Sequence, residues 1–181
     1  MGLVAVRFHA RGAYRFFSTP LSAVTAALVE LEEIWGKRSR DWAERIALAS
    51  GMAARVRFLE KALLAALQEK DRSDRAVDRC LHLIERAGGQ VRVAQLAAEL
   101  GLCDRQLTRR FENAVGVSPK EFARVSRFLN GVRRLRAGRR RNLTETALEC
   151  GYFDQAHFNH EFREFAGMTP GEFLFSPNVV F

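Results

Sequence analysis

The second half of the chain repeats itself, and this repeat limits the possible folds more than any other feature of the sequence. Residues 93–122 read VAQLAAELGLCDRQLTRRFENAVGVSPKEF, and residues 143–173 read LTETALECGYFDQAHFNHEFREFAGMTPGEF. Matching positions lie 50 residues apart before a turn and 51 apart after it, as in the pairs Gly101/Gly151, Phe111/Phe162 and Pro119/Pro170. Such a repeat is typical of one supersecondary unit that occurs twice.

Each repeat has the pattern of a short helix, a turn and a second helix. Gly101 and Gly151 stand at the turn, where a residue without a Cβ atom can adopt a positive φ. The second helix of each repeat carries two apolar residues at i, i+4 spacing, predicted to face inward: Leu107 with Phe111, and Phe158 with Phe162. VSPKE and MTPGE then predict a helix start with a capping box. This is the pattern of a helix-turn-helix, present twice.

The second helix of the first repeat is a candidate recognition helix. A helix-turn-helix places the N-terminal half of its second helix against base edges in the DNA major groove. With the apolar pair inward, three polar side chains share an exposed strip and a fourth lies beside it: Arg105, Thr108, Arg109 and Gln106. Arg can bind guanine at two points and Gln can pair with adenine, so we predict that these residues read bases. The alternative is a solvated helix face.

The charge of the chain is basic and unevenly distributed. Lys and Arg number 29 against 21 Asp and Glu, and the formal net charge is +8. Residues 105–141 hold twelve Lys or Arg and two Glu, whereas residues 142–181 hold one Arg and six acidic residues. A basic excess suits nucleic acid, a membrane surface or an acidic partner. We predict phosphate contacts at Arg110, Arg139, Arg140 and Arg141. For Arg139, Arg140 and Arg141 the alternative is a flexible polar linker.

The stretch ECGYFDQAHFNHEF, residues 149–162, contains side chains that often bind metal ions: Cys150, Asp154, His157, His160 and Glu161. The repeat assigns two of them other roles. Asp154 stands at the N-cap of the second recognition helix, where Asp is favoured, and Cys150 matches an inward position of the first repeat. We therefore expect neither a metal ion nor a cofactor. Metal-assisted catalysis at the two histidines is the enzymatic alternative.

Other features bound the class of protein. No Ser/His/Asp triad, phosphate-binding loop or paired carboxylates stand out, so we expect no enzyme. Three cysteines without paired spacing argue against a disulfide framework and favour a reducing compartment. No apolar run approaches the roughly 18–20 residues that span a bilayer, and the start of the chain is too weakly apolar for a signal peptide. These features predict a cytoplasmic protein without membrane contact.

The first 70 residues predict a different arrangement. LVAVRFHARGAYRFF, residues 3–17, is rich in β-branched and aromatic residues and predicts a strand or a hairpin. Three helices should follow, the first of them ended by Gly36, over residues 20–35, 40–50 and 52–69. The polar stretch EKDRSD, residues 69–74, marks a domain boundary, and Ser73 is predicted to cap the next helix.

Residues 77–174 closely resemble the double helix-turn-helix DNA-binding domain of AraC/XylS-type transcriptional regulators. The stretch ALECGYFDQAHFNHEFREFAGMTPGEF looks like the most specific part of that family's pattern. The resemblance implies seven helices, two recognition helices on one face of the DNA, and control of promoters, usually by activation. It also implies DNA contacts from the second recognition helix, at Gln155, Ala156, Asn159 and His160.

The sequence departs from that family at several positions. Cys103 stands where members often carry Ser, so we expect the first recognition helix to be weakly capped. His160 stands where Arg is frequent, and the acidic Glu161 follows it. We therefore predict that the second repeat binds DNA less firmly than the first. Residues 1–69 resemble the tail of an N-terminal sensor domain without its β-barrel, as expected of a naturally short regulator or of a fragment.

The predicted fold is mainly α, with two helix-turn-helix subdomains joined by a long helix and preceded by a short β segment and a helical linker region. Residues 1–70 are predicted to be the remnant of a sensor domain and residues 71–181 an AraC-type DNA-binding domain. The latter divides into a first helix-turn-helix, a connecting helix and a second helix-turn-helix, at about 93–115, 119–137 and 143–166.

The function predicted from these features is transcription regulation. We expect a sequence-specific activator that inserts two recognition helices into successive major grooves of double-stranded DNA. RNA polymerase and a second copy of the chain are further candidate partners. The alternative is a truncated regulator that acts mainly through protein–protein contacts and binds DNA weakly.

Overall fold

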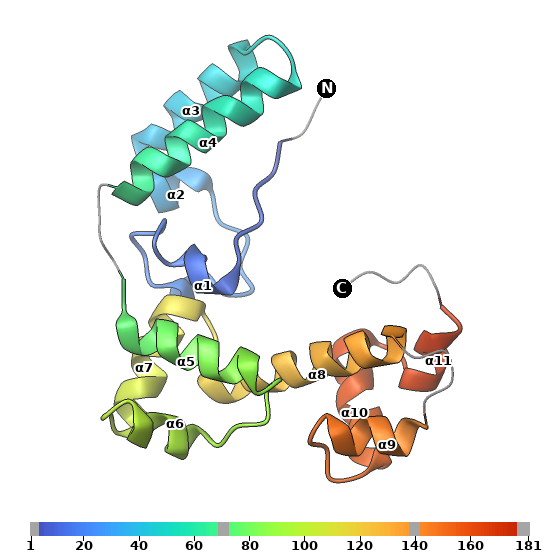
Figure 1. The fold of residues 1–181 in the computed structure, drawn as a ribbon. Helices are drawn as coiled ribbons and strands as arrows, with labels where there is room; N and C mark the ends of the chain where they lie inside the picture. Colours follow the sequence, from blue (N-terminus) through green and yellow to red (C-terminus); the bar gives the residue numbers. More distant parts are fainter. Residues whose placement is uncertain (1–3, 69–72, 138–141, 177–181) are drawn as a thin grey trace. The chain divides into compact units, whose positions relative to one another are not determined.

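The computed structural model describes residues 4–68, 73–137 and 142–176. No β-strand occurs within these ranges, and none of their helices is long and apolar enough to cross a membrane. A 3-10 turn at Leu21–Ala23 lies between α1 and α2. The α-helices (Figure 1) are α1 Ala10–Ala13, α2 Leu31–Trp35, α3 Lys37–Leu48, α4 Met52–Gln68, α5 Arg75–Arg86, α6 Val93–Glu99, α7 Asp104–Val115, α8 Pro119–Ala137, α9 Leu143–Glu149, α10 Gln155–Ala166 and α11 Pro170–Leu174.

The strand or hairpin predicted at the start of the chain is wrong for the residues described there, 4–17. Residues 4–9 belong to no ladder, and the chain then forms the single-turn helix α1. The aromatic rings fold back on one another, because the ring centroid of Phe8 lies 4.9 Å from that of Phe16 and 5.3 Å from that of Phe17. β-propensity depends on packing against neighbouring strands, and this segment buries its rings locally instead.

The helix predicted over residues 20–35 is interrupted. Residues 24–30 lie outside any helix, so only the 3-10 turn and the five residues of α2 are helical. Ala26 has a φ of +56°, which a right-handed helix does not accommodate. Gly36 ends α2 as predicted, at a φ of +61°.

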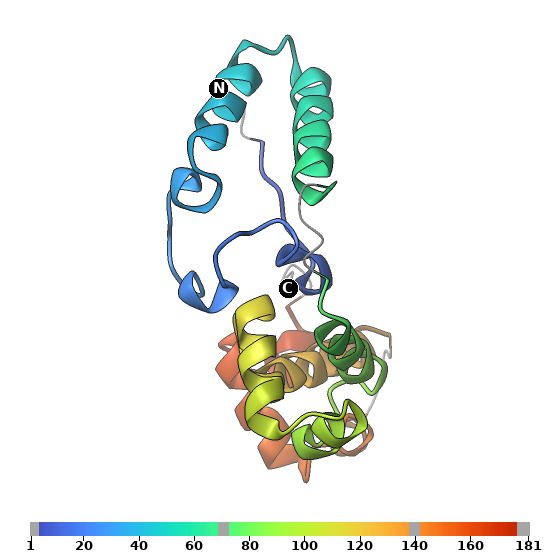
Figure 2. The same ribbon diagram turned by 90° about the vertical axis from the view of Figure 1, so that its left-hand side faces the viewer.

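The helices α3 and α4 form an antiparallel pair, which is seen side by side in two views (Figures 1 and 2). Trp42 of α3 is buried, and its ring lies 5.2 Å from that of Trp35 in α2. Trp35 in turn stacks on Phe17 at 5.5 Å and donates from Nε1 to the carbonyl of Phe16 at 2.8 Å. These aromatic contacts join the N-terminal segment to the helical pair.

The chain forms two compact units that are interleaved in sequence. Unit 1 comprises Met1–Asp78 and Arg105–Ser118, and unit 2 comprises Arg79–Asp104 and Pro119–Phe181. Unit 1 thus contains α1 to α4 and nearly all of α7, whereas unit 2 contains α6 and α8 to α11. The domain division predicted near residue 70 stays a prediction.

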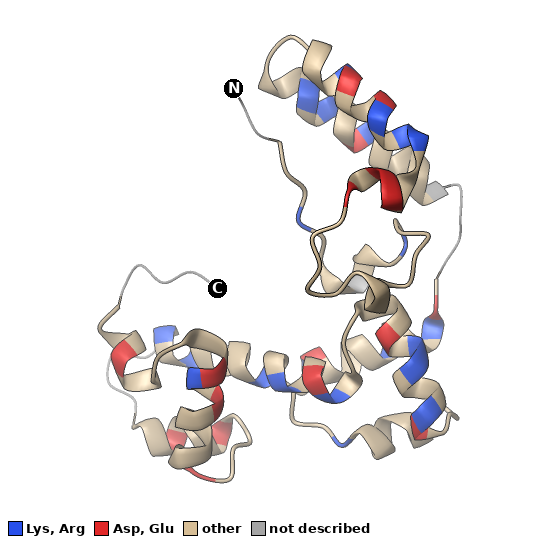
Figure 3. Cartoon of the chain, turned by 180° about the vertical axis from the view of Figure 1, so that it is seen from behind, with Lys and Arg blue, Asp and Glu red and all other residues tan. Residues whose placement is uncertain are grey.

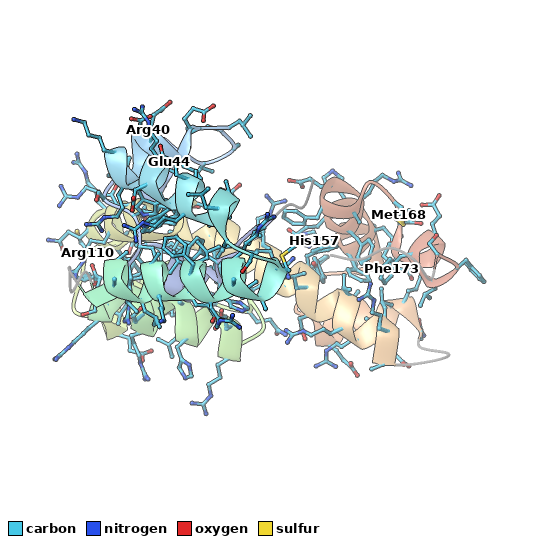
Figure 4. The ribbon with its side chains drawn as sticks, turned by 90° about the horizontal axis from the view of Figure 1, so that it is seen from above. Arg40, Glu44, Arg110, His157, Met168 and Phe173 are labelled. Atoms are coloured by element: carbon cyan, nitrogen blue, oxygen red, sulfur yellow. The ribbon has the colours of Figure 1, made fainter. Side chains whose placement is uncertain are left out.

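The core of unit 2 lies where α8 packs against α9, α10 and α11. Its buried side chains form one cluster: Phe128, Val132, Leu135, Ala147, Cys150, Tyr152, Phe158, Phe162 and Phe173. Gly131 of α8 allows a close approach, because a Cβ atom there would lie 3.0 Å from the ring of Phe158. Met168 and Phe173 lie on the segment that follows α10 (Figure 4). Phe173 belongs to the cluster, and Met168 packs against it. The core thus fixes how α10 lies on α8.

The repeat predicted several local features correctly. The connecting helix α8 spans Pro119–Ala137, as expected. Gly101 and Gly151 have φ values of +66° and +78°, which is the conformation that the turns require. The four apolar residues predicted to face inward from the two recognition helices are all fully buried. Thr169, Pro170 and Glu172 form the predicted capping box.

Gly89, in the turn after α5, is a position where we expect alanine to be costly. Its φ is +83°, and a Cβ atom would lie 2.2 Å from the carbonyl oxygen of Ala123 and 2.5 Å from the backbone nitrogen of Arg127. Gly89→Ala should lower the free energy of unfolding by more than about 2 kcal/mol in urea titrations followed by circular dichroism. Gly101→Ala is the matched control, because its Cβ would meet nothing within 4 Å. Equal losses in both variants would contradict the steric account.

Candidate nucleic-acid interface

The helix α7 carries the base readers predicted in the first repeat. Its apolar pair is fully buried, and on the rest of its surface Arg105, Gln106 and Arg109 are exposed while Thr108 is half-buried. Within the described part of the chain, the guanidinium groups of Arg105 and Arg109 have no ion-pair partner. Two arginines on one strip of a helix are therefore accessible to hydrogen-bond acceptors outside the chain.

Arg110, predicted to contact phosphate, forms an ion pair within the chain, and 41% of its side chain is exposed. Its Nε and Nη2 atoms donate to the two carboxylate oxygens of Asp74, at 2.8 and 2.7 Å. The same carboxylate accepts from the backbone of Ala76 and Val77, so Asp74 caps α5 in the role predicted for Ser73. Burial alone would raise the pKa of Asp74, but the bonds from Arg110 and Val77 hold this pKa below its ordinary value. The phosphate contact predicted at Arg110 stays a prediction.

The C-terminal part of α7 is anchored by the N-terminal segment of unit 1. Thr25 donates from its hydroxyl to the carbonyl of Gly116 at 2.8 Å, and the hydroxyl of Ser22 lies 3.4 Å from the side-chain oxygen of Asn113. Gly116 has a φ of +90°, and a Cβ atom there would lie 2.4 Å from the hydroxyl oxygen of Thr25. These contacts hold the end of α7 that is remote from Arg105.

The second recognition helix, α10, is capped at both ends. The carboxylate of Asp154 accepts a hydrogen bond from the backbone nitrogen of His157 at 2.7 Å, which confirms the predicted N-cap. At the other end Gly167, at a φ of +71°, donates its backbone N–H to the carbonyl of Arg163. The caps define where the helix begins and ends.

The predicted contact residues of α10 differ in their surroundings. Ala156 and His160 are exposed, whereas Gln155 and Asn159 are half-buried. Gln155 accepts through Oε1 from the hydroxyl of Thr144 at 2.7 Å. The Oδ1 atom of Asn159 is buried without a hydrogen-bond partner in the described part of the chain. The helix thus offers amide and imidazole groups where α7 offers guanidinium groups.

Arg163 is a candidate contact residue that the sequence analysis did not single out. It lines a surface pocket with a volume of about 590 Å³. The other lining residues are Ala156, Asn159, His160, Glu164 and Thr169. Its side chain is exposed. Spacing alone could have found it, because positions 156, 159, 160 and 163 follow the i, i+3, i+4, i+7 rule for one helix face.

Glu161 is buried in an ion-pair network between α10 and α8. Its carboxylate accepts from Arg124 at 3.0 Å and from Arg127 at 3.1 Å, and only 4% of its side chain is exposed. Arg124 also binds Glu164 at 2.6 Å. Burial alone would raise the pKa of Glu161, but the hydrogen bonds from Arg127 and Arg124 hold it below its ordinary value. The network ties α10 to the connecting helix.

These ion pairs correct one reason for expecting weak DNA binding by the second repeat. Glu161 does not face outward beside His160, and Glu149 of α9 is likewise paired, with Arg134 of α8. Figure 3 colours the positions of basic residues along α8 and of acidic residues on the helices of unit 2 that follow it. The basic excess before residue 142 and the acidic excess after it therefore offset one another in part within unit 2.

Arg139, Arg140 and Arg141 lie outside the described residues. Among the residues that the structure describes, no three His, Cys, Asp or Glu side chains come together as a metal site. Cys150 is fully buried, with its thiol pKa raised chiefly by desolvation, and Asp154 is engaged as the N-cap.

The N-cap of α10 allows a direct test. Asp154→Ala removes the acceptor for the backbone N–H of His157 and should lower the free energy of unfolding by about 1 kcal/mol. Asp154→Asn keeps an oxygen at the same place, so most of the stability should return. Thermal and urea unfolding of both variants check this. An Asn variant as unstable as the Ala variant would mean that the charge, rather than the cap, is what matters.

Comparison with known proteins agrees with this geometry. Residues 96–175 match the family described as "Helix-turn-helix domain". The chain is 29% identical over 86 residues to "Probable transcriptional regulator LumQ" of Photobacterium leiognathi. The aligned residues are 48% of this chain and 34% of that protein. The chain thus spans about a third of the length of this relative.

Three solved structures share the fold. A "probable AraC family transcriptional regulator" from Rhodopseudomonas palustris has 28% identity and a TM-score of 0.51, covering 57% of this chain and 97% of its own. The DNA-binding domain of AdpA, solved "in complex with a target DNA", has 25% identity and a TM-score of 0.52, covering 57% and 93%. The C-terminal domain of AraT from Geobacillus stearothermophilus has 19% identity and a TM-score of 0.55, covering 61% and 92%, and supports the fold alone.

The matched segment is therefore a helix-turn-helix DNA-binding domain. Its fold is that of the DNA-binding domains of AraC-family regulators, and the proteins that it matches are described as transcriptional regulators.

Proposed function

We propose that the chain is a sequence-specific transcriptional activator that inserts α7 and α10 into successive major grooves of double-stranded DNA. The observation that carries this proposal is the exposed strip of α7, with Arg105 and Arg109 outward and Leu107 and Phe111 fully buried behind them. Each arginine can donate two hydrogen bonds to the O6 and N7 atoms of a guanine. Thr108 and Gln106 complete the reading surface of this helix.

On α10 we assign base reading to Gln155, Asn159 and His160, and we add Arg163 as a contact to phosphate. An asparagine amide can pair with the N6 and N7 atoms of adenine. An imidazole and two amides make fewer charged contacts than the two arginines of α7. The second repeat should therefore contribute less to affinity than the first.

The connecting helix suits a reader of two grooves. It has 19 residues and is about 28 Å long at the usual rise per residue. Recognition helices that enter successive major grooves on one face of the duplex lie about 34 Å apart. Arg139, Arg140 and Arg141, which follow this helix in the sequence, remain our proposed phosphate contacts beside it.

Selection of bound sites from random duplex DNA tests the proposal. Two short motifs about one helical turn apart are expected, with guanine prominent in the motif that α7 reads. In the presence of a bound promoter site and RNA polymerase, transcription should rise when the protein is added. Recovery of no enriched motif would contradict sequence-specific binding, and a fall in transcription would replace activation by repression.

The second candidate function is regulation mainly through protein contacts, and the exposed apolar residues of α3 and α4 favour it. They are Leu48, Met52, Val56 and Leu64. A second copy of the chain is the partner that we propose for this surface. The salt dependence of DNA binding separates the two functions, because log K should fall by about 0.9 per phosphate contact for each unit of log salt. A flat salt response, together with a dimer in analytical centrifugation, would favour this second function.

A further inference from the structure

Unit 1 contains a cavity of about 750 Å³ between the N-terminal segment and the helices α2, α3 and α4. Aromatic and aliphatic side chains form most of its wall: Phe8, Phe17, Trp35, Trp42 and Leu63. Sites for small molecules in proteins are typically concave, largely apolar and about 300–1,000 Å³ in volume. The cavity therefore has the size and the lining of a binding site, and no DNA contact proposed above involves it.

Arg55 of α4 is the one charged residue among the described residues that line this cavity. Its Nε atom is buried and has no hydrogen-bond partner in the described part of the chain. Buried donors in folded proteins are nearly always paired, so an unpaired one points to a missing acceptor. Ser39, the other polar residue of the lining, already donates from its hydroxyl to the carbonyl of Gly36 at 2.8 Å.

We propose that the cavity binds an apolar monocarboxylate, whose carboxylate accepts hydrogen bonds from Arg55 and whose apolar part lies against the aromatic wall. A carboxylate matches the planar guanidinium in shape and charge. A neutral apolar molecule would leave the Nε donor unpaired, and a cation would face an arginine. A polyol would carry several hydroxyl groups into a wall that offers few partners for them.

The two tryptophans make the proposal directly measurable. The chain contains two Trp residues, Trp35 and Trp42, and both line the cavity. Titration of the full chain with decanoate should change the intrinsic tryptophan fluorescence in a saturable way. Decanol, which has the same alkyl length without the charge, should bind at least tenfold more weakly, and decylamine should bind more weakly still.

Two variants of α4 separate Arg55 from general effects of charge. Arg55→Met should reduce the affinity for decanoate at least tenfold, to the level of decanol. Arg57→Met removes the same charge from an exposed position of the same helix that is not part of the lining, so it should leave decanoate binding unchanged. Circular dichroism verifies that both variants fold.

The comparison of the two ligands decides the matter even where Arg55→Met fails to fold. Equal affinities of the unchanged protein for decanoate and decanol would overturn the proposal, as would no saturable change with decanoate. A loss in Arg57→Met as large as that in Arg55→Met would overturn the role of Arg55. Each of these readouts is measured without DNA, so their failure is distinct from a failure of DNA binding.

Discussion

Replacing Arg105 and Arg109 together by alanine is expected to weaken binding to a selected DNA site about 100-fold. A bidentate contact between arginine and guanine contributes about 1–3 kcal/mol of discrimination. Two such contacts at the lower part of this range correspond to two factors of ten. Both guanidinium groups are exposed on α7 and unpaired within the described part of the chain, so no intramolecular contact should be lost with them. Fluorescence anisotropy at fixed salt concentration measures the change.

The control for this experiment removes the same charge elsewhere. Arg57 and Lys61 are exposed on α4, outside the helix-turn-helix segment. Arg57→Ala combined with Lys61→Ala should lower specific affinity by less than about threefold, through the weaker general attraction of the chain to DNA. If both double variants lose affinity equally, net charge rather than base reading by α7 is responsible.

Glu161→Gln is expected to be the most destabilising polar substitution in unit 2, at about 3 kcal/mol. It would leave Arg124 and Arg127 without their shared carboxylate, and the side chain of Arg127 is only 19% exposed. Breaking one side of a buried ion pair typically costs about 3–5 kcal/mol. The partial exposure of the arginines places the expected value at the lower end. Urea unfolding followed by circular dichroism measures it.

The same ion pair predicts a pH dependence. The pKa of Glu161 in the folded chain lies below the ordinary value of 4.5, so its contribution to stability is fully present above that pH. The contribution declines as the pH falls further and the carboxylate becomes protonated in the folded chain. The difference in unfolding free energy between the unchanged protein and Glu161→Gln should therefore shrink as the pH falls below about 4.5.

Glu164→Gln is the matched control for both measurements. Glu164 lies on the same helix and binds the same Arg124, but 45% of its side chain is exposed. Pairs at such positions are usually worth less than about 1 kcal/mol, since water solvates both partners. A loss as large as that of Glu161→Gln would mean that burial is not the cause of the effect.

The helices of the two repeats could be predicted closely because their determinants are local. The turn glycines, the i, i+4 apolar pairs and the cap at Asp154 each act within a few residues, so spacing alone reveals them. For the aromatic residues at the start of the chain, the local sequence does not decide between two structures. They suit a strand or a compact aromatic cluster, and the stacking of Phe17 on Trp35, which in turn contacts Trp42, favours the cluster.

The electrostatic part of the site could not be predicted in this way. Arg110 and Asp74 are 36 residues apart, and Arg124 and Glu161 are 37 apart. Which charges pair over such separations depends on how the helices pack. A count of charges along the chain therefore exaggerated both the basic character of residues 105–141 and the acidic character of residues 142–181.

Arg110 and Glu161 occupy matching positions in the two repeats, yet their ion pairs have opposite polarity. Arg110 meets a carboxylate, and Glu161 meets two guanidinium groups. A chimera that grafts α10 into the place of α7 would set Glu161 against Asp74, and the reciprocal graft would set Arg110 against Arg124 and Arg127. Each of these two helices is thus matched in charge to the helices around it, and a swap must also exchange the charged residues that face it.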